Sequence, residues 1–283
     1  DCLLSRGLGD VYKRQREKKA SIYGAQKSLI ITVLGGLSML GGIILLSLAT
    51  DTFSIQAMIS KASDIQNSPF FILAMILFMI GAFTKSAQVP FYIWLPDAME
   101  APTPVSAYLH SATMVKAGLY LIARITPIFA ISEGWVWTIT IVGLITLFWA
   151  SLNATKQHDL KGILAFSTVS QLGMIMSMLG IGAVSYHYQG ANSQLYVAGF
   201  VAAIFHLINH ATFKGALFMI TGGIDHSTGT RDVKKLGGLL TIMPISFTLT
   251  VITTLSMAGV PPFNGFLSVS YTHLRAHETR GNL

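Results

Sequence analysis

The chain has 283 residues, of which 52% are hydrophobic and only 11% are charged. Soluble domains carry about 25% charged residues, so this composition excludes an ordinary soluble domain and predicts a membrane protein. The net charge of +7 does not indicate a nucleic-acid partner, because the basic residues lie in short clusters between apolar runs. The single cysteine, Cys2, excludes a disulfide framework and a thiolate metal site.

The two ends of the chain differ in character from the sequence between them. Segments 1–15 and 269–283 are polar, lack periodicity and adjoin membrane-like sequence abruptly. We expect them to be a non-native leader and a non-native tail, comparable to fusion scars, and we take about 16–268 as the interpretable chain.

The interpretable sequence predicts an all-α polytopic membrane protein with about seven spans. Its apolar runs approach the twenty residues that cross a bilayer as a helix. The expected spans are 28–49, 69–94, 105–125, 134–152, 162–184, 196–224 and a seventh that begins near residue 239. Proline removes a backbone donor, so Pro90 in the second span and Pro261 and Pro262 in the seventh predict discontinuous helices.

Basic residues gather in alternate loops of this predicted topology. With seven spans, segments 16–27, 156–161 and 231–235 all fall on one side of the membrane, and the opposite loops are nearly uncharged. This positive-inside distribution predicts that the basic side faces the cytoplasm.

The chemically informative residues are ionisable groups inside the apolar runs. They are Lys85 in the second span, His110 and Lys116 in the third, and His206, His210 and Lys214 in the sixth. Such a group costs about 2.5 to 3.5 kcal/mol if it faces lipid at mid-depth, so its presence favours an ion or proton pathway.

Lys85 lies about fifteen residues into its span and just before the break at Pro90. A lysine near a helix end can also snorkel to the interface, which is the structural alternative. Transporters, however, place coupling sites at discontinuous helices, so we interpret Lys85 as a group that loads and releases a proton.

The sixth span carries His206, His210 and Lys214 at four-residue spacing, which places all three on one helix face. Imidazole titrates near physiological pH, so the row is a candidate proton relay. A zinc site is one alternative, but the glutamate of the metalloprotease pattern and a third ligand are missing. Polar contacts between membrane helices are another alternative. Three titratable groups on one face favour the relay.

Three further ionisable residues were interpreted by position. His110 follows the proline-rich linker and is expected across from Lys85. Lys116 is six residues further on, so it is expected on another side of the helix, paired with a carboxylate of another subunit or facing the interface. Lys161 opens the fifth span, where position alone predicts a cytoplasmic anchor.

Three runs carry a family resemblance. They are KSAQVPFYIWLPDAMEAPTPVSA at 85–107, DLKGILAFSTVSQ at 159–171 and GVPPFNGF at 259–266. They resemble the antiporter-like subunits of Mrp-type multisubunit sodium/proton antiporters and of the membrane arm of respiratory complex I, and are most similar to the Mrp-type A subunits. The resemblance covers nearly all of 16–268.

The resemblance implies a fold of two inverted five-helix repeats, each with a discontinuous helix. Segment 16–125 would end the first repeat and 126–268 would form an incomplete second. The residues it assigns to a proton pathway are Lys85 as a central site, His110 as the onward link, and Lys161, His206, His210 and Lys214 in connecting elements and a second half-channel. The family's glutamate partner would precede Arg16, and its distal lysine and acidic residue would follow Ser268, where this chain has Val269 and Ser270.

The sequence therefore predicts a proton-conducting subunit of a multisubunit sodium/proton antiporter in the bacterial inner (plasma) membrane. Its partners would be other subunits, lipid, protons and sodium, with no cofactor, no metal, no covalent chemistry and no nucleic acid. The alternative is a proton-pumping membrane subunit of NADH:quinone oxidoreductase, in which proton flux requires NADH and quinone. A non-transporting structural subunit is a third class.

Overall fold

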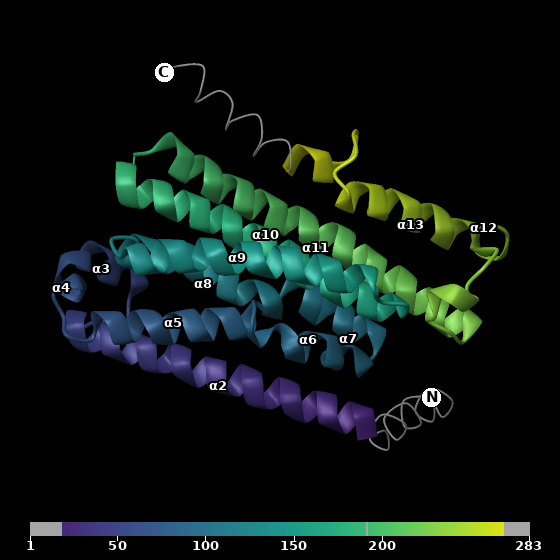
Figure 1. Cartoon of the computed structure of the whole chain (residues 1–283), viewed down its shortest axis with the longest axis horizontal. Helices are drawn as coiled ribbons and strands as arrows, with labels where there is room; N and C mark the ends of the chain where they lie inside the picture. Colours follow the sequence, from purple (N-terminus) through teal and green to yellow (C-terminus); the bar gives the residue numbers. More distant parts are fainter. Residues whose placement is uncertain (1–18, 191, 269–283) are drawn as a thin grey trace.

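The computed structural model describes residues 19–190 and 192–268, so the expected leader 1–15 and tail 269–283 lie outside it. Every regular element in the described part is a helix, and the isolated bridge between Asp159 and Asp232 is the β-type contact given there. The predicted all-helical class is confirmed for these residues (Figure 1).

The helices follow one another along the chain with short connections. In order they are α2 (Lys19–Thr50), α3 (Ile55–Ser60), α4 (Ala62–Gln66), α5 (Phe71–Lys85), η1 (Phe91–Ile93), α6 (Trp94–Asp97), η2 (Ala98–Glu100), α7 (Thr103–Ala107), η3 (Tyr108–Ala112), α8 (Met114–Phe129), α9 (Glu133–Thr155), α10 (Leu160–Gln189), α11 (Gln194–Thr228), η4 (Val233–Lys235), α12 (Leu239–Ile242) and α13 (Pro244–Met257).

Five helical stretches among the described residues are long and apolar enough to cross a membrane. They are most of α2, the continuous stretch of α7, η3 and α8, and the three helices α9, α10 and α11. The other two predicted spans appear as the shorter apolar helices α5, with 15 residues, and α13, with 14 residues. Both end before a proline, which cannot continue a helix. The chain is thus a multi-pass membrane protein.

Helix α2 begins well before the predicted span. Lys27, which the sequence suggested lay in a basic loop, is inside a helix of 32 residues. At 1.5 Å per residue this helix is about 48 Å long, which exceeds the hydrocarbon core, so its first turns extend beyond the apolar layer.

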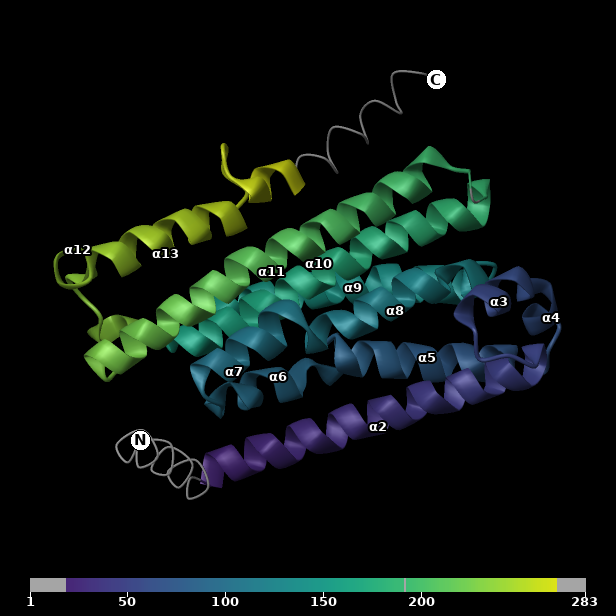
Figure 2. The same ribbon diagram turned by 180° about the vertical axis from the view of Figure 1, so that it is seen from behind.

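The long helices run side by side in one bundle. Figures 1 and 2 show α2 lying along α5 on one side, and α9, α10 and α11 packed together on the other. α2 and α5 approach closely at Gly81, where an added Cβ would meet Met39 and the backbone of Gly35. Outward-facing side chains such as Leu29, 63% exposed, and Phe148, 67% exposed, are apolar, as a lipid-facing surface requires.

The described parts of the three basic segments, 19–27, 156–161 and 231–235, lie at one end of the bundle, where α9 gives way to α10 and α11 gives way to α12 (Figure 1). Arg231 Nε lies 3.2 Å from Asp159 Oδ1, and Asp159 also forms the bridge with Asp232. The sequence predicted that these segments share one side, and the fold brings them together there.

Candidate functional site

The first helix break lies between Lys85, the last residue of α5, and Pro90, which precedes η1. The backbone groups that the break frees are bonded by side chains. Trp94 Nε1 donates to the carbonyl of Thr84 at 2.9 Å, and the amide of Val89 donates to Thr146 Oγ1 of α9 at 3.0 Å. An irregular backbone at membrane depth is tolerated where protein satisfies it in this way.

Lys85 is half-buried at this break, with its side chain against α2. An added Cβ on Gly36 of α2 would lie in van der Waals contact with Lys85 Nζ, at 3.9 Å, so the ammonium lies beside this helix. Two buried oxygens close by in sequence, Ser86 Oγ and Gln88 Oε1, have no hydrogen-bond partner among the described residues. The ion pairs of the described part involve other lysines and arginines, so no described carboxylate pairs with Lys85.

His110 lies in the π-helical turn η3 and is only 2% exposed. Its ring stands between Trp94 and Phe218, with centroid separations of 6.1 Å and 6.4 Å. Trp94 is the residue that bonds the end of α5, so the structure links His110 to the first break through this indole. His110 Nδ1 is buried without a hydrogen-bond partner in the described structure.

The row on α11 points into the protein. His206, His210 and Lys214 are at most 1% exposed. His206 Nε2 lies 2.6 Å from Gln171 Oε1, an oxygen that can only accept, so Nε2 carries hydrogen. Lys214 Nζ donates to Ser167 Oγ, also on α10. His206 thus makes the interhelical polar contact of the structural alternative, whereas neither ring nitrogen of His210 has a partner in the described part.

Lys116 joins this row, contrary to the expectation that it would face an interface. It is 5% exposed, and its Nζ donates to the carbonyl of Leu207 on α11 at 2.8 Å. Leu207 directly follows His206 and precedes His210 by less than one turn, so the Lys116 ammonium lies beside both histidines. The six-residue spacing predicted different sides of the helix, but both residues contact α11, His110 at Phe218 and Lys116 at Leu207. The one sequence signal that Lys116 is buried was its position inside an apolar run.

Lys161, which position alone predicts to be a cytoplasmic anchor, is buried at the basic end of the bundle. It lies in the first turn of α10, is 3% exposed, and donates from Nζ to the carbonyl of Ala101 at 3.0 Å. The linker before α7 folds over the start of α10 and covers the lysine. Lys161 and Ala101 are 60 residues apart, so no local sequence pattern could predict their contact.

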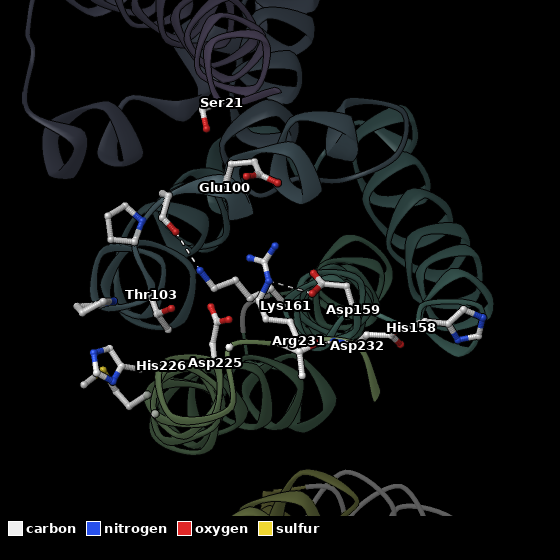
Figure 3. Close-up of a pocket in the computed structure, with 18 residues that line it drawn as sticks. Ser21, Glu100, Thr103, His158, Asp159, Lys161, Asp225, His226, Arg231 and Asp232 are labelled. Atoms are coloured by element: carbon white, nitrogen blue, oxygen red, sulfur yellow. Dashed lines mark hydrogen bonds and ion pairs between the residues drawn. The ribbon is translucent and has the colours of Figure 1, made fainter. Parts of the chain in front are cut away.

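A cavity of about 1190 Å³ opens at the basic end beside Lys161 (Figure 3). Its lining includes the carboxylates of Glu100, Asp159, Asp225 and Asp232, together with Lys161 and Arg231, which gives a formal charge of −2 when Lys161 is protonated. Figure 3 shows Asp225 and Glu100 on either side of Lys161 and Arg231 paired with Asp159. This acidic lining contrasts with the net positive charge of the chain.

A second cavity of about 540 Å³ adjoins the first and leads to His110. The two cavities share Ser21, Glu100, Ala101 and Pro102. The second also includes Asp97, whose Oδ2 lies 2.6 Å from Lys27 Nζ. Sequence reasoning placed Asp97 and Glu100 in a linker and assigned them no role. Among the described residues no group of three or more metal-ligating side chains is present.

A family profile described as "NADH:quinone oxidoreductase/Mrp antiporter, TM" matches residues 9–276. The chain is 95% identical over 267 residues to the Na(+)/H(+) antiporter subunit A1 of Staphylococcus epidermidis, covering 92% of this chain and 33% of that protein. It is 86% identical over 253 residues to the Na(+)/H(+) antiporter subunit A1 of Staphylococcus aureus, covering 89% of this chain and 32% of that protein. The chain therefore spans about a third of the length of these relatives.

Solved structures share the fold. A chain of the Mrp complex from Dietzia sp. superimposes with a TM-score of 0.80 at 38% identity, over 90% of this chain and 27% of the other. A chain of an archaeal respiratory membrane complex, the membrane-bound sulfane sulfur reductase, superimposes with a TM-score of 0.80 at 29% identity, over 92% of this chain and 51% of the other.

Proposed function

Since this chain belongs to the NADH:quinone oxidoreductase/Mrp antiporter transmembrane family, we propose that it is part of the proton-conducting subunit of a multisubunit sodium/proton antiporter. The names of its relatives in Staphylococcus support an antiporter. The subunit would lie in the bacterial plasma membrane with the basic end in the cytoplasm. Further subunits of the complex, sodium, protons and lipid would be its partners.

One observation carries this proposal: His210 is fully buried, and neither of its ring nitrogens has a partner in the described part of the chain. An unsatisfied buried polar group costs about 1 to 3 kcal/mol, so a group used only for packing would be an apolar residue. His206 and Lys214 lie one turn away from His210 on α11, and Lys116 bonds the carbonyl of Leu207 on the same helix. A titratable group amid other titratable groups is what a proton relay requires.

The electrostatics of this row favour movement of protons. Neighbours on one helix face lie about 5 to 6 Å apart, and two like charges at that distance repel by about 3 kcal/mol at an effective dielectric constant near 20. The ion pairs of the described part join Lys27 to Asp97 and Arg231 to Asp159, so no described carboxylate is paired with a lysine or histidine of this row. The four residues would therefore not all be charged at once, and a proton arriving at one would displace a proton from its neighbour.

Lys85 and His110 would form the other end of the relay. The break beside Lys85 leaves Ser86 Oγ and Gln88 Oε1 free to bind water, which could carry protons to and from the lysine. Lys161 would complete the pathway at the basic end. In the complete subunit, a carboxylate that approaches Lys85 would hold its proton, and withdrawal of that carboxylate would release it.

The proposal also includes the number of spans and their division into repeats. We infer that α5 and α13, with the short helical turns after their breaks, serve as the second and seventh spans. Residues 16–125 would then end the first of two inverted five-helix repeats, and 126–268 would begin the second. The pair of breaks, one before Pro90 and one at Pro261 and Pro262, supports this repeat.

A proton-pumping subunit of a respiratory complex is the second candidate, favoured by the similarity to the archaeal respiratory membrane complex. The two functions differ in what drives proton movement. Flux that follows a sodium gradient would select the antiporter. Flux that requires NADH and quinone would select the respiratory subunit.

The test is sodium-driven proton flux in everted membrane vesicles that contain the complete antiporter. We expect Lys85→Ala and His210→Leu each to lower the flux by about a hundredfold or more, since a positioned proton-transfer group contributes that much. Lys156→Ala, which removes an exposed lysine, is the matched control and should leave the flux intact. Unchanged flux in Lys85→Ala, with the complex assembled, would show that the relay is wrong.

A further inference from the structure

The two cavities at the basic end meet at Glu100. It lines both cavities, together with Ser21, Ala101 and Pro102, and it is the one ionisable side chain among the four shared residues. It ends the short helix η2 and directly precedes Ala101, whose carbonyl accepts from Lys161. One branch of this hollow therefore leads from Glu100 to Lys161, and the other leads from Glu100 to His110.

The two branches, and the part that they share, which we call the fork, present polar atoms that can bind water. His110 is 2% exposed, lines the smaller cavity, and has no partner for Nδ1 among the described residues. Ser21 Oγ, in the shared part, also has none. Lys161 has three donors, one of which bonds Ala101. A water needs about 10 to 15 Å³ and two to four polar partners, and both cavities exceed that volume many times.

The charges of the fork favour protons over anions. Arg231 pairs with Asp159, and Lys27 pairs with Asp97, so these four groups largely neutralise one another. Glu100 and Asp225 remain near Lys161 without an ion pair in the described part (Figure 3). Asp225 lines only the larger cavity, whereas Glu100 lines both. With Asp232 these carboxylates outnumber the protonated Lys161, and a net negative lining raises the local concentration of cations such as protons.

We propose that the two cavities form one forked, hydrated access path from the basic end, and that Glu100 at the fork takes up protons and delivers them to both His110 and Lys161. The Glu100 carboxylate accepts a hydrated proton (H3O+) that enters from the bulk solution at the mouth of the larger cavity, and a neutral water molecule is left. Its O–H then releases that proton through water to Nδ1 of His110 or to the neutral amine of Lys161, which restores the carboxylate. This inference rests on the proposed function and names where its protons enter.

Accessibility of the smaller branch is the first test, made on the complete antiporter with its reactive cysteines replaced. Ser28 lines the smaller cavity, and Ser38, nearly three turns further along α2, lines neither cavity. A charged methanethiosulfonate reagent applied to the basic-end face is expected to modify Ser28→Cys at least tenfold faster than Ser38→Cys, since only a hydrated site admits it. Equal protection of both cysteines would mean that this branch is dry and would overturn the proposal.

The second test measures flux against pH. The titratable and charged groups that share these cavities with Glu100 are, in the larger one, His158, Asp159, Lys161, Asp225, His226, Arg231 and Asp232, and, in the smaller one, Asp97 and His110. All are retained in Glu100→Gln. In this variant the proton flux is expected to fall about tenfold at alkaline pH, where protons are scarce. At acidic pH it should fall much less. Glu100→Asp should restore most of the loss, and Asp64→Asn, an exposed carboxylate on α4, should cause none.

The outcomes separate this inference from the proposed function. If Glu100→Gln keeps full flux at both pH values while Lys85→Ala loses it, protons enter elsewhere and the relay stands. If Lys85→Ala also keeps full flux, the proposed function fails first. Equal loss in Glu100→Gln at both pH values, without rescue by aspartate, would assign Glu100 a structural role and overturn the proposal.

Discussion

The two helix breaks both contain a Val-Pro pair but differ in how far the described part of the chain covers them. At the first break Ser86, Ala87 and Gln88 are fully buried between neighbouring helices. At the second break, between α13 and the helical turn that follows, Val260 is 39% exposed and both prolines are exposed. α13 contains no buried residue in the described structure.

The two breaks also differ in the side-chain hydrogen bonds to their backbone groups. The first break is bonded from two sides, by Trp94 to the end of α5 and by Thr146 to the backbone after it. The second is bonded by Asn209 of α11, whose Nδ2 donates to the carbonyl of Asn264 at 3.0 Å. Freed backbone groups need partners in the membrane, and a buried break has no water to replace a lost one. We therefore expect the first break to tolerate substitution much less than the second.

The largest expected effect is at Trp94. Trp94→Ala removes a side chain that is 1% exposed together with its bond to Thr84, and should lower the free energy of unfolding by about 3 to 5 kcal/mol. Denaturation of the complete antiporter in detergent would measure it. Trp137→Ala, at a tryptophan 46% exposed on α9, should cost clearly less. Similar losses for both would mean that burial at the first break is unimportant.

The next effect is at Thr146. Thr146→Val keeps the volume but leaves the amide of Val89 without its acceptor, which should cost about 1 to 3 kcal/mol. Thr140→Val is the control on the same helix, because Thr140 Oγ1 donates only to the carbonyl of Val136 within α9. The same denaturation midpoints would compare them. A control that falls as far as Thr146→Val would contradict this account.

The smallest expected effect is at the second break. Asn209→Leu removes the bond to Asn264, and because Asn264 is exposed we expect only about 0.5 to 1.5 kcal/mol. Limited proteolysis of the loop between α13 and the following turn would report local loosening. A loss equal to that of Trp94→Ala would remove the contrast between the two breaks.

Local sequence identified much of the candidate site. The four-residue spacing of His206, His210 and Lys214 predicted one helix face, and all three side chains are buried. Proline predicted where the second span would be interrupted, and α5 ends five residues before Pro90. Both features follow from helix geometry and proline chemistry, which depend on neighbours in sequence. Whether these residues carry protons remains the prediction that the flux measurements address.

The sequence by itself determined the helical class, the approximate spans and the clustering of basic segments, because a bilayer demands apolar runs of set length and asymmetric loop charge. Only the tertiary structure decided what the ionisable groups touch. Lys116 bonds a carbonyl 91 residues away, Lys161 bonds one 60 residues away, and Glu100 stands between two cavities built from segments far apart in the chain. These contacts depend on how whole helices pack, which no local pattern of residues specifies.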